Sequence, residues 1–260
     1  FGMECYEKGL ITNRDTGGLE LKFGNGQAMV EMVKKIALRE DIGDVLAEGV
    51  KGASEKIGNG SQHFAMQIKG VEMTGYEVRG LKTCALGYAV SRRGADHQRH
   101  GSYTWDQSGK VDRYKVDAGR GKLVMGDEDN YCIFDSMILC KFTRTIWKGY
   151  DEIAKVYSLV TGIPMTGAEL EKTGERISNL ARLYNVREGL TRKGDSLPPR
   201  VMKDPIPSGT SKGSFVSEQE LNTLLDGYYD VRGWTREGVP KKEKIEELGL
   251  SAYGNILGKE

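Results

Sequence analysis

Residues 166–189 read TGAELEKTGERISNLARLYNVREG, and this stretch decides the fold class. Its large apolar side chains recur at the spacing of one helix face: Leu170, Ile177, Leu180 and Leu183. Thr166 stands three residues before Glu169, which is the pattern of a capping box at a helix N-terminus. Gly189 is a typical stop at the other end. The stretch therefore predicts a long amphipathic helix over residues 168–188.

The same helical spacing recurs on both sides of this stretch. We expect further helices at residues 27–40, 42–57, 81–91, 127–140, 149–160, 217–230 and 240–248. Polar, glycine-rich sequence at 92–126 and a basic, proline-containing stretch at 190–216 predict long irregular connectors. No hairpin signal and no alternation of strands with helices stands out. The sequence thus predicts an all-α, multihelical fold of about ten helices.

Composition and charge exclude several classes of protein. The chain has 260 residues, of which 38% are hydrophobic, so it has enough apolar material for a folded core. With 38 Lys and Arg against 37 Asp and Glu, the formal net charge is +1. No global attraction to nucleic acid or anionic lipid follows from that balance. No apolar run reaches the ~18 residues of a membrane span. We expect neither nucleic-acid binding nor a membrane span.

Cysteine and histidine are scarce. Four Cys, none in a Cys-x-x-Cys pair, are too few for a disulfide framework at this length, so a cytoplasmic location is expected. Three His with so few companions do not complete a closed metal site.

The opening residues, FGMECYEKG, look like the last turns of a helix closed by Lys8 and Gly9. We therefore expect a piece of a longer protein, with a trimmed N-terminus as the alternative.

Residues 92–101, RRGADHQRHG, gather cations, an aspartate and two imidazoles in ten positions. Such a segment could bind an anion or phosphate, and His97 could move a proton near neutral pH. The alternative is a solvated basic loop in which the aspartate pairs with an arginine. Spacing alone favours this second interpretation.

Cys140 ends the apolar run 135–140, DSMILC. A cysteine in such a place is usually a small buried hydrophobe, and as a metal ligand it would need partners from elsewhere.

Residues 184–200 resemble a docking element, and the aromatic residues of 228–234 are expected in the core. No phosphate-binding glycine loop, serine-nucleophile elbow or His-Glu-x-x-His motif is present. Motif spacing alone therefore leaves the function open.

An ordered set of short runs, taken together, resembles the aldehyde:ferredoxin oxidoreductase family of tungsten–pterin enzymes. The runs are MECYEKGLI (3–11), ELKFGN (20–25), IGDVLAEGV (42–50), VRG (78–80), SRRGADHQR (91–99), DSMILC (135–140), GERI (174–177), NVREGLTRKGDSLPPR (185–200) and YYxxRGW (228–234). No single run is decisive, but they occur in family order from end to end.

The resemblance implies two packed helical domains with long irregular connectors. Residues 1–75 would be part of the first, truncated at its N-terminus, and residues 76–260 would form the second, which carries the cofactor-facing segments. The family's N-terminal β-rich domain, which cradles the pterin, is missing from this sequence. The Cys-x-x-Cys-x-x-x-Cys run that gives three cluster thiolates and the first Asp-x-x-Gly pterin motif are missing with it.

Carried over residue by residue, the resemblance assigns five site residues. Cys140 matches the fourth ligand of a 4Fe–4S cluster. Asp135, with Leu139 beside the cysteine, matches the second pterin-binding motif. There a carboxylate can accept hydrogen bonds from pterin N–H groups. His97 matches a histidine close to the tungsten, and Arg99 matches a cationic position facing the cofactor.

Other positions match no ligand or depart from the family. Cys5, Cys84 and Cys132 correspond to no metal ligand and are expected to be structural. Thr83 and Cys84 replace small residues that are common in the family after the Val-Arg-Gly run, which puts the local pocket shape in doubt.

The resemblance implies that the parent enzyme oxidises a small aldehyde to a carboxylic acid. Tungsten held by two pterins (tungstopterin) would take two electrons, and the 4Fe–4S cluster would pass them singly to ferredoxin. This chain alone is expected to be inactive, with its cofactors incomplete or absent, and to form homo-oligomers through exposed apolar surface. Two alternatives stay open: a related tungsten enzyme that reduces an aromatic acyl thioester, and a non-catalytic helical scaffold from a split gene.

Overall fold

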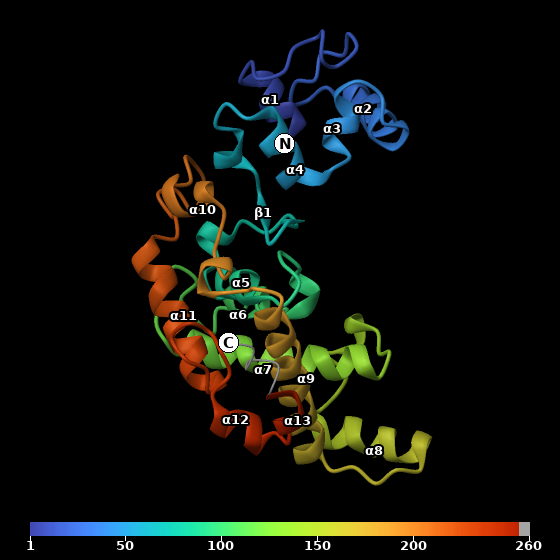
Figure 1. Cartoon of the computed structure of the whole chain (residues 1–260), viewed down its shortest axis with the longest axis vertical. Coiled ribbons are helices and arrows are strands. Elements are labelled where there is room, and N and C mark those ends of the chain that lie inside the picture. Colours follow the sequence, from blue (N-terminus) through green and yellow to red (C-terminus); the bar gives the residue numbers. More distant parts are fainter. Residues whose placement is uncertain (255–260) are drawn as a thin grey trace. The chain divides into compact units, whose positions relative to one another are not determined.

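The structure is a computed structural model that describes residues 1–254. Within these residues the chain forms thirteen α-helices, five short 3-10 helices and one small hairpin (Figure 1). The helices are α1 (Gly2–Glu7), α2 (Gly26–Leu38), α3 (Ile42–Leu46), α4 (Gly49–Ile57), α5 (Lys82–Val90), α6 (Tyr103–Gln107), α7 (Arg120–Ser136), α8 (Tyr150–Thr161), α9 (Gly167–Arg187), α10 (Pro199–Lys203), α11 (Glu218–Arg232), α12 (Lys242–Glu247) and α13 (Ser251–Gly254). The prediction of a multihelical, all-α fold is confirmed.

The chain divides into two compact units. The first contains Phe1–Gly75 together with two later segments, Arg93–Ala95 and Leu197–Phe215. The second contains Tyr76–Arg92, Asp96–Ser196 and the residues from Val216 onward. None of the helices in residues 1–254 combines the length and the apolar character that crossing a bilayer requires.

The first unit packs α1 to α4 around a small apolar core. Its buried residues are Cys5, Ile11, Leu21, Ala28, Met32 and Phe64. α10, which comes late in the chain, contacts the 3-10 helix η1 (Ser61–Phe64) of this unit. Arg200 of α10 pairs with the Glu4 carboxylate of α1, and this pairing lowers the pKa of Glu4. A charged contact therefore joins the two ends of the first unit.

Two sequence predictions in the first unit are wrong. The helix expected at 42–57 is interrupted after α3, because Gly49, the first residue of α4, adopts a positive φ of 78°. A hairpin, which the sequence does not announce, pairs β1 (Gln67–Ile68) with β2 (Val71–Glu72). Its two turn residues, Lys69 and Gly70, both have positive φ, the backbone that a tight two-residue hairpin turn needs.

The second unit is built on α7, which packs against both α9 and α11, while α8 packs on α9 (Figure 1). Glycines allow the close approach. A Cβ on Gly121 of α7 would lie 2.5 Å from the Tyr228 backbone nitrogen of α11. A Cβ on Gly174 of α9 would lie 2.5 Å from the Asp129 carbonyl oxygen of α7. The three helices therefore meet at backbone distance.

Several predicted helix ends are confirmed in the second unit. Thr166 and Glu169 form a capping box at the start of α9, and Ser217 and Glu220 form another at the start of α11. α5 is buried along its whole length, as its small apolar residues lead one to expect. The predicted connectors at 92–126 and 190–216 contain the short helices α6 and α10.

The position of α7 is the main error in the second unit. The sequence predicts a helix over 127–140, but α7 runs from Arg120 to Ser136. After it, Ile138 adopts a left-handed φ of 57°, and the Leu139 N–H donates to the Phe134 carbonyl at 2.9 Å. This is a Schellman motif, which ends a helix. Leu139 and Cys140 therefore lie outside the helix.

Candidate functional site

Asp135 lies in the last turn of α7, and three cations surround its carboxylate. Lys141 Nζ is 2.7 Å from Oδ1, and Arg92 Nη2 is 3.6 Å from Oδ2. Arg99 Nη1 donates to the same Oδ2. The carboxylate is about one-third exposed, since its side chain keeps 35% of its accessible surface. Asp135 thus stands at the surface as the shared anion of a basic cluster.

Arg99 is fixed from its other side by the turn that carries it. Its Nε lies 3.2 Å from the Asp96 carboxylate. Asp96 also caps the 3-10 helix η3 (His97–Arg99), because its Oδ1 accepts the Gln98 N–H at 2.9 Å. The Asp–Arg pair expected for a solvated basic loop therefore exists, and Arg99 also extends to Asp135 on α7.

His97 lies among aromatic rings. Its ring centroid is 5.4 Å from that of Tyr76 and 5.9 Å from that of Tyr103, and the two tyrosines stack at 4.4 Å. The Gln98 amide nitrogen is 2.6 Å from His97 Nε2. His97 Nδ1 is buried and has no hydrogen-bond partner among the described residues. Burial lowers the pKa of His97 below its usual value, so the ring is neutral at pH 7.

Cys140 is exposed, in contrast to the other three cysteines. It precedes the 3-10 helix η4 (Lys141–Thr143), and its carbonyl accepts the Thr143 N–H at 2.9 Å. Cys5, Cys84 and Cys132 are buried and unpaired, which agrees with the structural role expected for them. Within residues 1–254 no group of three or more His, Cys, Asp or Glu side chains is placed to hold a metal ion. The described chain therefore offers Cys140 as one thiol donor only.

Lys141 connects the cysteine segment to the histidine turn. Its ammonium donates to the Gln98 carbonyl and to Asp135, and lies 4.6 Å from the centre of the Tyr131 ring. Burial lowers the pKa of Lys141, and the pairing with Asp135 opposes that shift. One side chain thus joins the elements that carry His97, Asp135 and Cys140.

Leu139 has a packing role that the sequence does not reveal. It contacts the core cluster that includes Ile133 and Phe134 of α7. An apolar contact of this kind commonly accompanies a Schellman motif. Leu139 therefore anchors the backbone next to Cys140 in the core.

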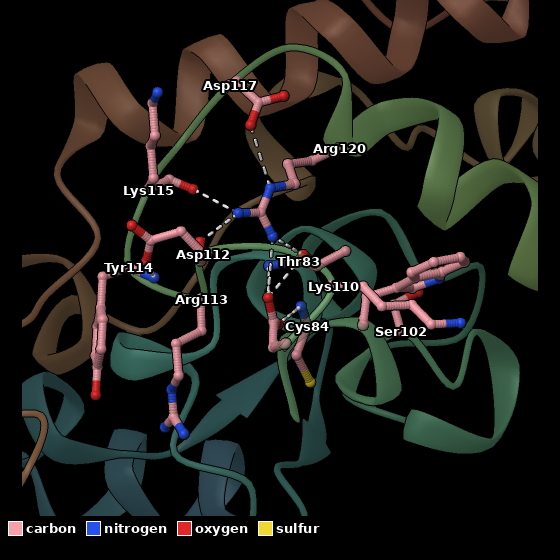
Figure 2. Close-up of polar contacts among 12 residues, drawn as sticks. Thr83, Cys84, Ser102, Lys110, Asp112, Arg113, Tyr114, Lys115, Asp117 and Arg120 are labelled. Atoms are coloured by element: carbon pink, nitrogen blue, oxygen red, sulfur yellow. Dashed lines mark hydrogen bonds and ion pairs between the residues drawn. The ribbon is translucent and has the colours of Figure 1, made fainter. Parts of the chain in front are cut away.

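A buried polar network at the opposite end of α7 from Asp135 is not predicted by the sequence. Figure 2 shows the Arg120 guanidinium reaching Thr83, the backbone carbonyl of Lys115 and the side chain of Asp117. Arg120 Nη1 is also 3.1 Å from Asp106 Oδ1, and the Asp106 carboxylate accepts the backbone N–H groups of Thr83 and Cys84. This network explains why α7 begins at Arg120, seven residues before the predicted helix.

The same network gives Thr83 and Cys84 a structural explanation. Their N–H groups are at the start of α5, where a helix leaves backbone donors without intrahelical partners. The Asp106 carboxylate satisfies two of these donors at 3.2 Å and 2.9 Å. These two departures from the family pattern thus lie at an internal helix cap.

Arg92 links the site to the centre of the helix bundle. It donates to the Cys132 sulfur at 3.0 Å, and Cys132 in turn contacts the Ser178 hydroxyl at 3.3 Å. Ser178 donates to Asp129, which pairs with the fully buried Arg232. The basic cluster on Asp135 is therefore continuous with buried charges between α7, α9 and α11.

Comparisons with known proteins assign the chain to a family. Residues 1–250 match the family described as aldehyde ferredoxin oxidoreductase, domains 2 & 3. The tungsten-containing aldehyde ferredoxin oxidoreductases of Pyrococcus abyssi and Pyrococcus horikoshii are each 36% identical over 258 residues, 96% of this chain and 42% of theirs. An aliphatic sulfonate oxidoreductase, WOR-like subunit, of Pyrococcus furiosus is 30% identical and covers 96% of this chain and 39% of its own length.

A solved structure shares the fold. The active-site complex BamBC of benzoyl coenzyme A reductase with 1,5-dienoyl-CoA superposes with a TM-score of 0.75 at 23% identity, covering 98% of this chain and 43% of its own. The chain spans about two fifths of the length of the curated relatives that it matches. Residues 1–250 match the model of domains 2 & 3, and the chain therefore belongs to the aldehyde ferredoxin oxidoreductase family.

Proposed function

We propose that this chain is the C-terminal part of a tungsten–pterin enzyme that oxidises aldehydes to carboxylic acids and delivers the electrons to ferredoxin. The observation that carries the proposal is the junction made by Lys141, which brings the elements of Cys140, Asp135 and His97 together in one unit. Four curated relatives at 34% to 36% identity bear the aldehyde name, which favours an aldehyde over the sulfonate or thioester named in more distant matches.

The donor chemistry of Cys140 fits one ligand of a 4Fe–4S cluster. Its thiol is exposed and lies outside the helix, so it is accessible to a metal centre. The other three thiolates would come from polypeptide that carries the rest of the enzyme. When bound, the tungstopterin would supply the two-electron acceptor and the cluster would carry single electrons onward. The chain alone is therefore inactive in this proposal.

Asp135 and its cations would bind the pterin. A carboxylate accepts hydrogen bonds from N–H groups, and this one is exposed enough to meet a ligand. Arg99 and Lys141 hold the carboxylate in place and add positive charge beside it. Positive charge at this position favours an anionic cofactor over a neutral one.

His97 would act on the substrate carbonyl as a hydrogen-bond donor. The Gln98 amide nitrogen can only donate, so His97 Nε2 accepts from it and the ring proton resides on Nδ1. Nδ1–H has no acceptor among the described residues and is therefore the donor for a substrate carbonyl oxygen. The lowered pKa of His97 keeps the ring neutral at pH 7, so Nδ1–H would polarise that carbonyl by a hydrogen bond and would keep its own proton.

The partners in this proposal are ferredoxin, a small aldehyde, the remaining part of the same enzyme and a second copy of the chain. The four free thiols suit a reducing compartment, and we infer a cytoplasmic location.

The proposal is tested with a hybrid enzyme, in which the part of the Pyrococcus abyssi relative that this chain does not match is joined ahead of Phe1. We expect this hybrid to hold tungsten and a cluster and to reduce a viologen dye when an aldehyde is added. Cys140→Ser should lose the cluster signal in electron paramagnetic resonance, while Cys132→Ser, at a buried thiol, should keep it.

Two results would overturn the proposal. One is dye reduction by the hybrid with an aromatic acyl thioester or a sulfonate but with no aldehyde. The other is stoichiometric tungsten and aldehyde-dependent dye reduction in the 260-residue chain alone, which would contradict its inactivity.

A further inference from the structure

The helices α7, α9 and α11 pack together in the second unit (Figure 1), and residues of all three line a small polar cavity. Its volume is about 10 Å³, which is about the space that one water molecule needs. Its wall includes two cations, a carboxylate and two neutral polar side chains: Arg92, Arg182, Glu128, Ser178 and Asn185. Cavities that stay dry in proteins are lined by apolar groups, so this wall indicates a polar occupant.

Arg182 of α9 carries the strongest indication. Only 3% of its surface is exposed, and neither Nη1 nor Nη2 has a hydrogen-bond partner among the described residues. Its Nε, in contrast, donates to the Gly238 carbonyl at 2.7 Å. Burial removes the hydration of the two terminal nitrogens, which is strongly destabilising unless another group accepts from them. Both nitrogens belong to one rigid, planar fork, so a single oxygen atom can accept from the pair.

The charges around the cavity are already balanced, which favours a neutral occupant over an anion. Arg182 Nη1 lies 2.8 Å from the Asp195 carboxylate, in an ion pair that lacks the alignment of a hydrogen bond. Arg92 faces the Asp135 carboxylate. The Glu128 carboxylate is part of the cavity wall and would repel an anion placed there.

Glu128 provides an acceptor for the same occupant. The hydrogen bonds that its carboxylate receives from other described residues, Tyr228 and Arg232, both go to Oε2. Oε1 therefore keeps its capacity to accept from a further donor. A water molecule can accept from a guanidinium and donate to a carboxylate at the same time, and it fits a cavity of this size.

We propose that the cavity is a binding site for one internal water molecule, which accepts hydrogen bonds from Arg182 and donates to Glu128. Such a water connects α9 to α7 nearly as well as a direct hydrogen bond would. Arg92 lines the same cavity and faces Asp135, so the water adjoins one of the cations that surround this carboxylate. The inference does not depend on the proposed function, because it concerns the interior of the second unit.

The test counts the long-lived internal water molecules of the 260-residue chain by oxygen-17 magnetic relaxation dispersion. We expect Val90→Ile to lower this count by one, because Val90 lines the cavity and is only 3% exposed, so the added carbon takes the place of the water. Val201→Ile is the control. It adds the same carbon at a buried valine of the first unit, and it should leave the count unchanged.

An unchanged count in Val90→Ile overturns the inference. Broadening of the chloride-35 resonance that Val90→Ile abolishes would identify an anion as the occupant, and the inference would again be wrong. If Val90→Ile does not fold, the unaltered chain with labelled valine methyl groups decides. We then expect a nuclear Overhauser effect with the sign of a bound water at the Val90 methyl groups and none at those of Val201, and its absence at Val90 refutes the water site.

Discussion

Arg120 and Asp106 form an ion pair in the interior of the second unit, with Nη1 3.1 Å from Oδ1 and side-chain exposures of 3% and 0%. The other terminal nitrogen of the guanidinium donates to the backbone carbonyls of Asp112 and Lys115 (Figure 2). Burial raises the pKa of Asp106, and its hydrogen bonds and Arg120 oppose that shift. The pair fixes the connector between α6 and α7 to the start of α5.

Removing Arg120 should strongly destabilise the chain. Arg120→Met keeps much of the side-chain volume but leaves the Asp106 carboxylate buried without its cation, which typically costs about 3–5 kcal/mol. Urea unfolding followed by circular dichroism measures the loss. Arg236→Met is the control, because Arg236 is 57% exposed and its ion pairs are worth about 0–1 kcal/mol. Equal losses in the two variants would contradict the role assigned to Arg120.

Two glycines in the central helices should respond to alanine in opposite directions. Gly174→Ala places a Cβ 2.5 Å from the Asp129 carbonyl oxygen, so α9 and α7 must separate, at a cost of about 1–3 kcal/mol. Gly126→Ala, in α7, meets no atom within 4 Å and should stabilise the helix by about 0.5–1 kcal/mol. Thermal unfolding of both variants tests the pair. A stabilising Gly174→Ala would show that the helices are not in backbone contact.

The sequence predicts best where a local pattern determines the structure. The capping boxes at Thr166 and Ser217 and the apolar stripe of α9 involve residues close in the chain, and α9 and α11 form as predicted. The start of α7 depends on Arg120 meeting Asp106 and Thr83 through tertiary contacts, which periodicity cannot show. The end of α7 depends on an isoleucine in a glycine conformation, against its local preference.

The resemblance to the family predicts the site residues, but the sequence does not predict the contacts around them. Nothing in the spacing of Arg92, Asp135 and Lys141 shows that the two cations share that carboxylate, because Arg92 lies on a distant part of the chain. The sequence also does not predict that the Gln98 amide faces His97. These contacts remain open to direct test.

Asp127 should make the stability of the chain fall as pH rises. Burial raises its pKa to about 7, and its Oδ2 accepts hydrogen bonds from Ser102 and from the Trp105 indole. Between about pH 4 and pH 7 the folded state holds a proton that the unfolded state releases, so the free energy of unfolding declines over that range. Asp127→Asn keeps an oxygen acceptor for both donors and removes the charge.

The expected signature is a difference that grows with pH. Asp127→Asn should match the unaltered chain near pH 4 and exceed its stability by on the order of 2–4 kcal/mol near pH 8. Urea unfolding at a series of pH values measures it, with Asp230→Asn, at a 58% exposed carboxylate, as the control. A constant difference at all pH values would show that Asp127 is ionised throughout.

Lys141 should control the order of the histidine turn more than the stability of the fold. Lys141→Met keeps an apolar stem against Tyr131 but removes the donor to the Gln98 carbonyl and to Asp135. A hydrogen bond from a charged group is worth about 1.5–3 kcal/mol, so the Arg99 and Gly101 amides should exchange with solvent at least about tenfold faster. The free energy of global unfolding should change by less than about 1 kcal/mol, because Asp135 is partly exposed and keeps Arg99.

Hydrogen exchange by mass spectrometry measures the faster exchange of these amides, with Lys148→Met in the same segment as the control. Unchanged exchange at 97–101 would show that the turn is held by Asp96 alone, and the junction between His97 and Cys140 would then have no structural basis.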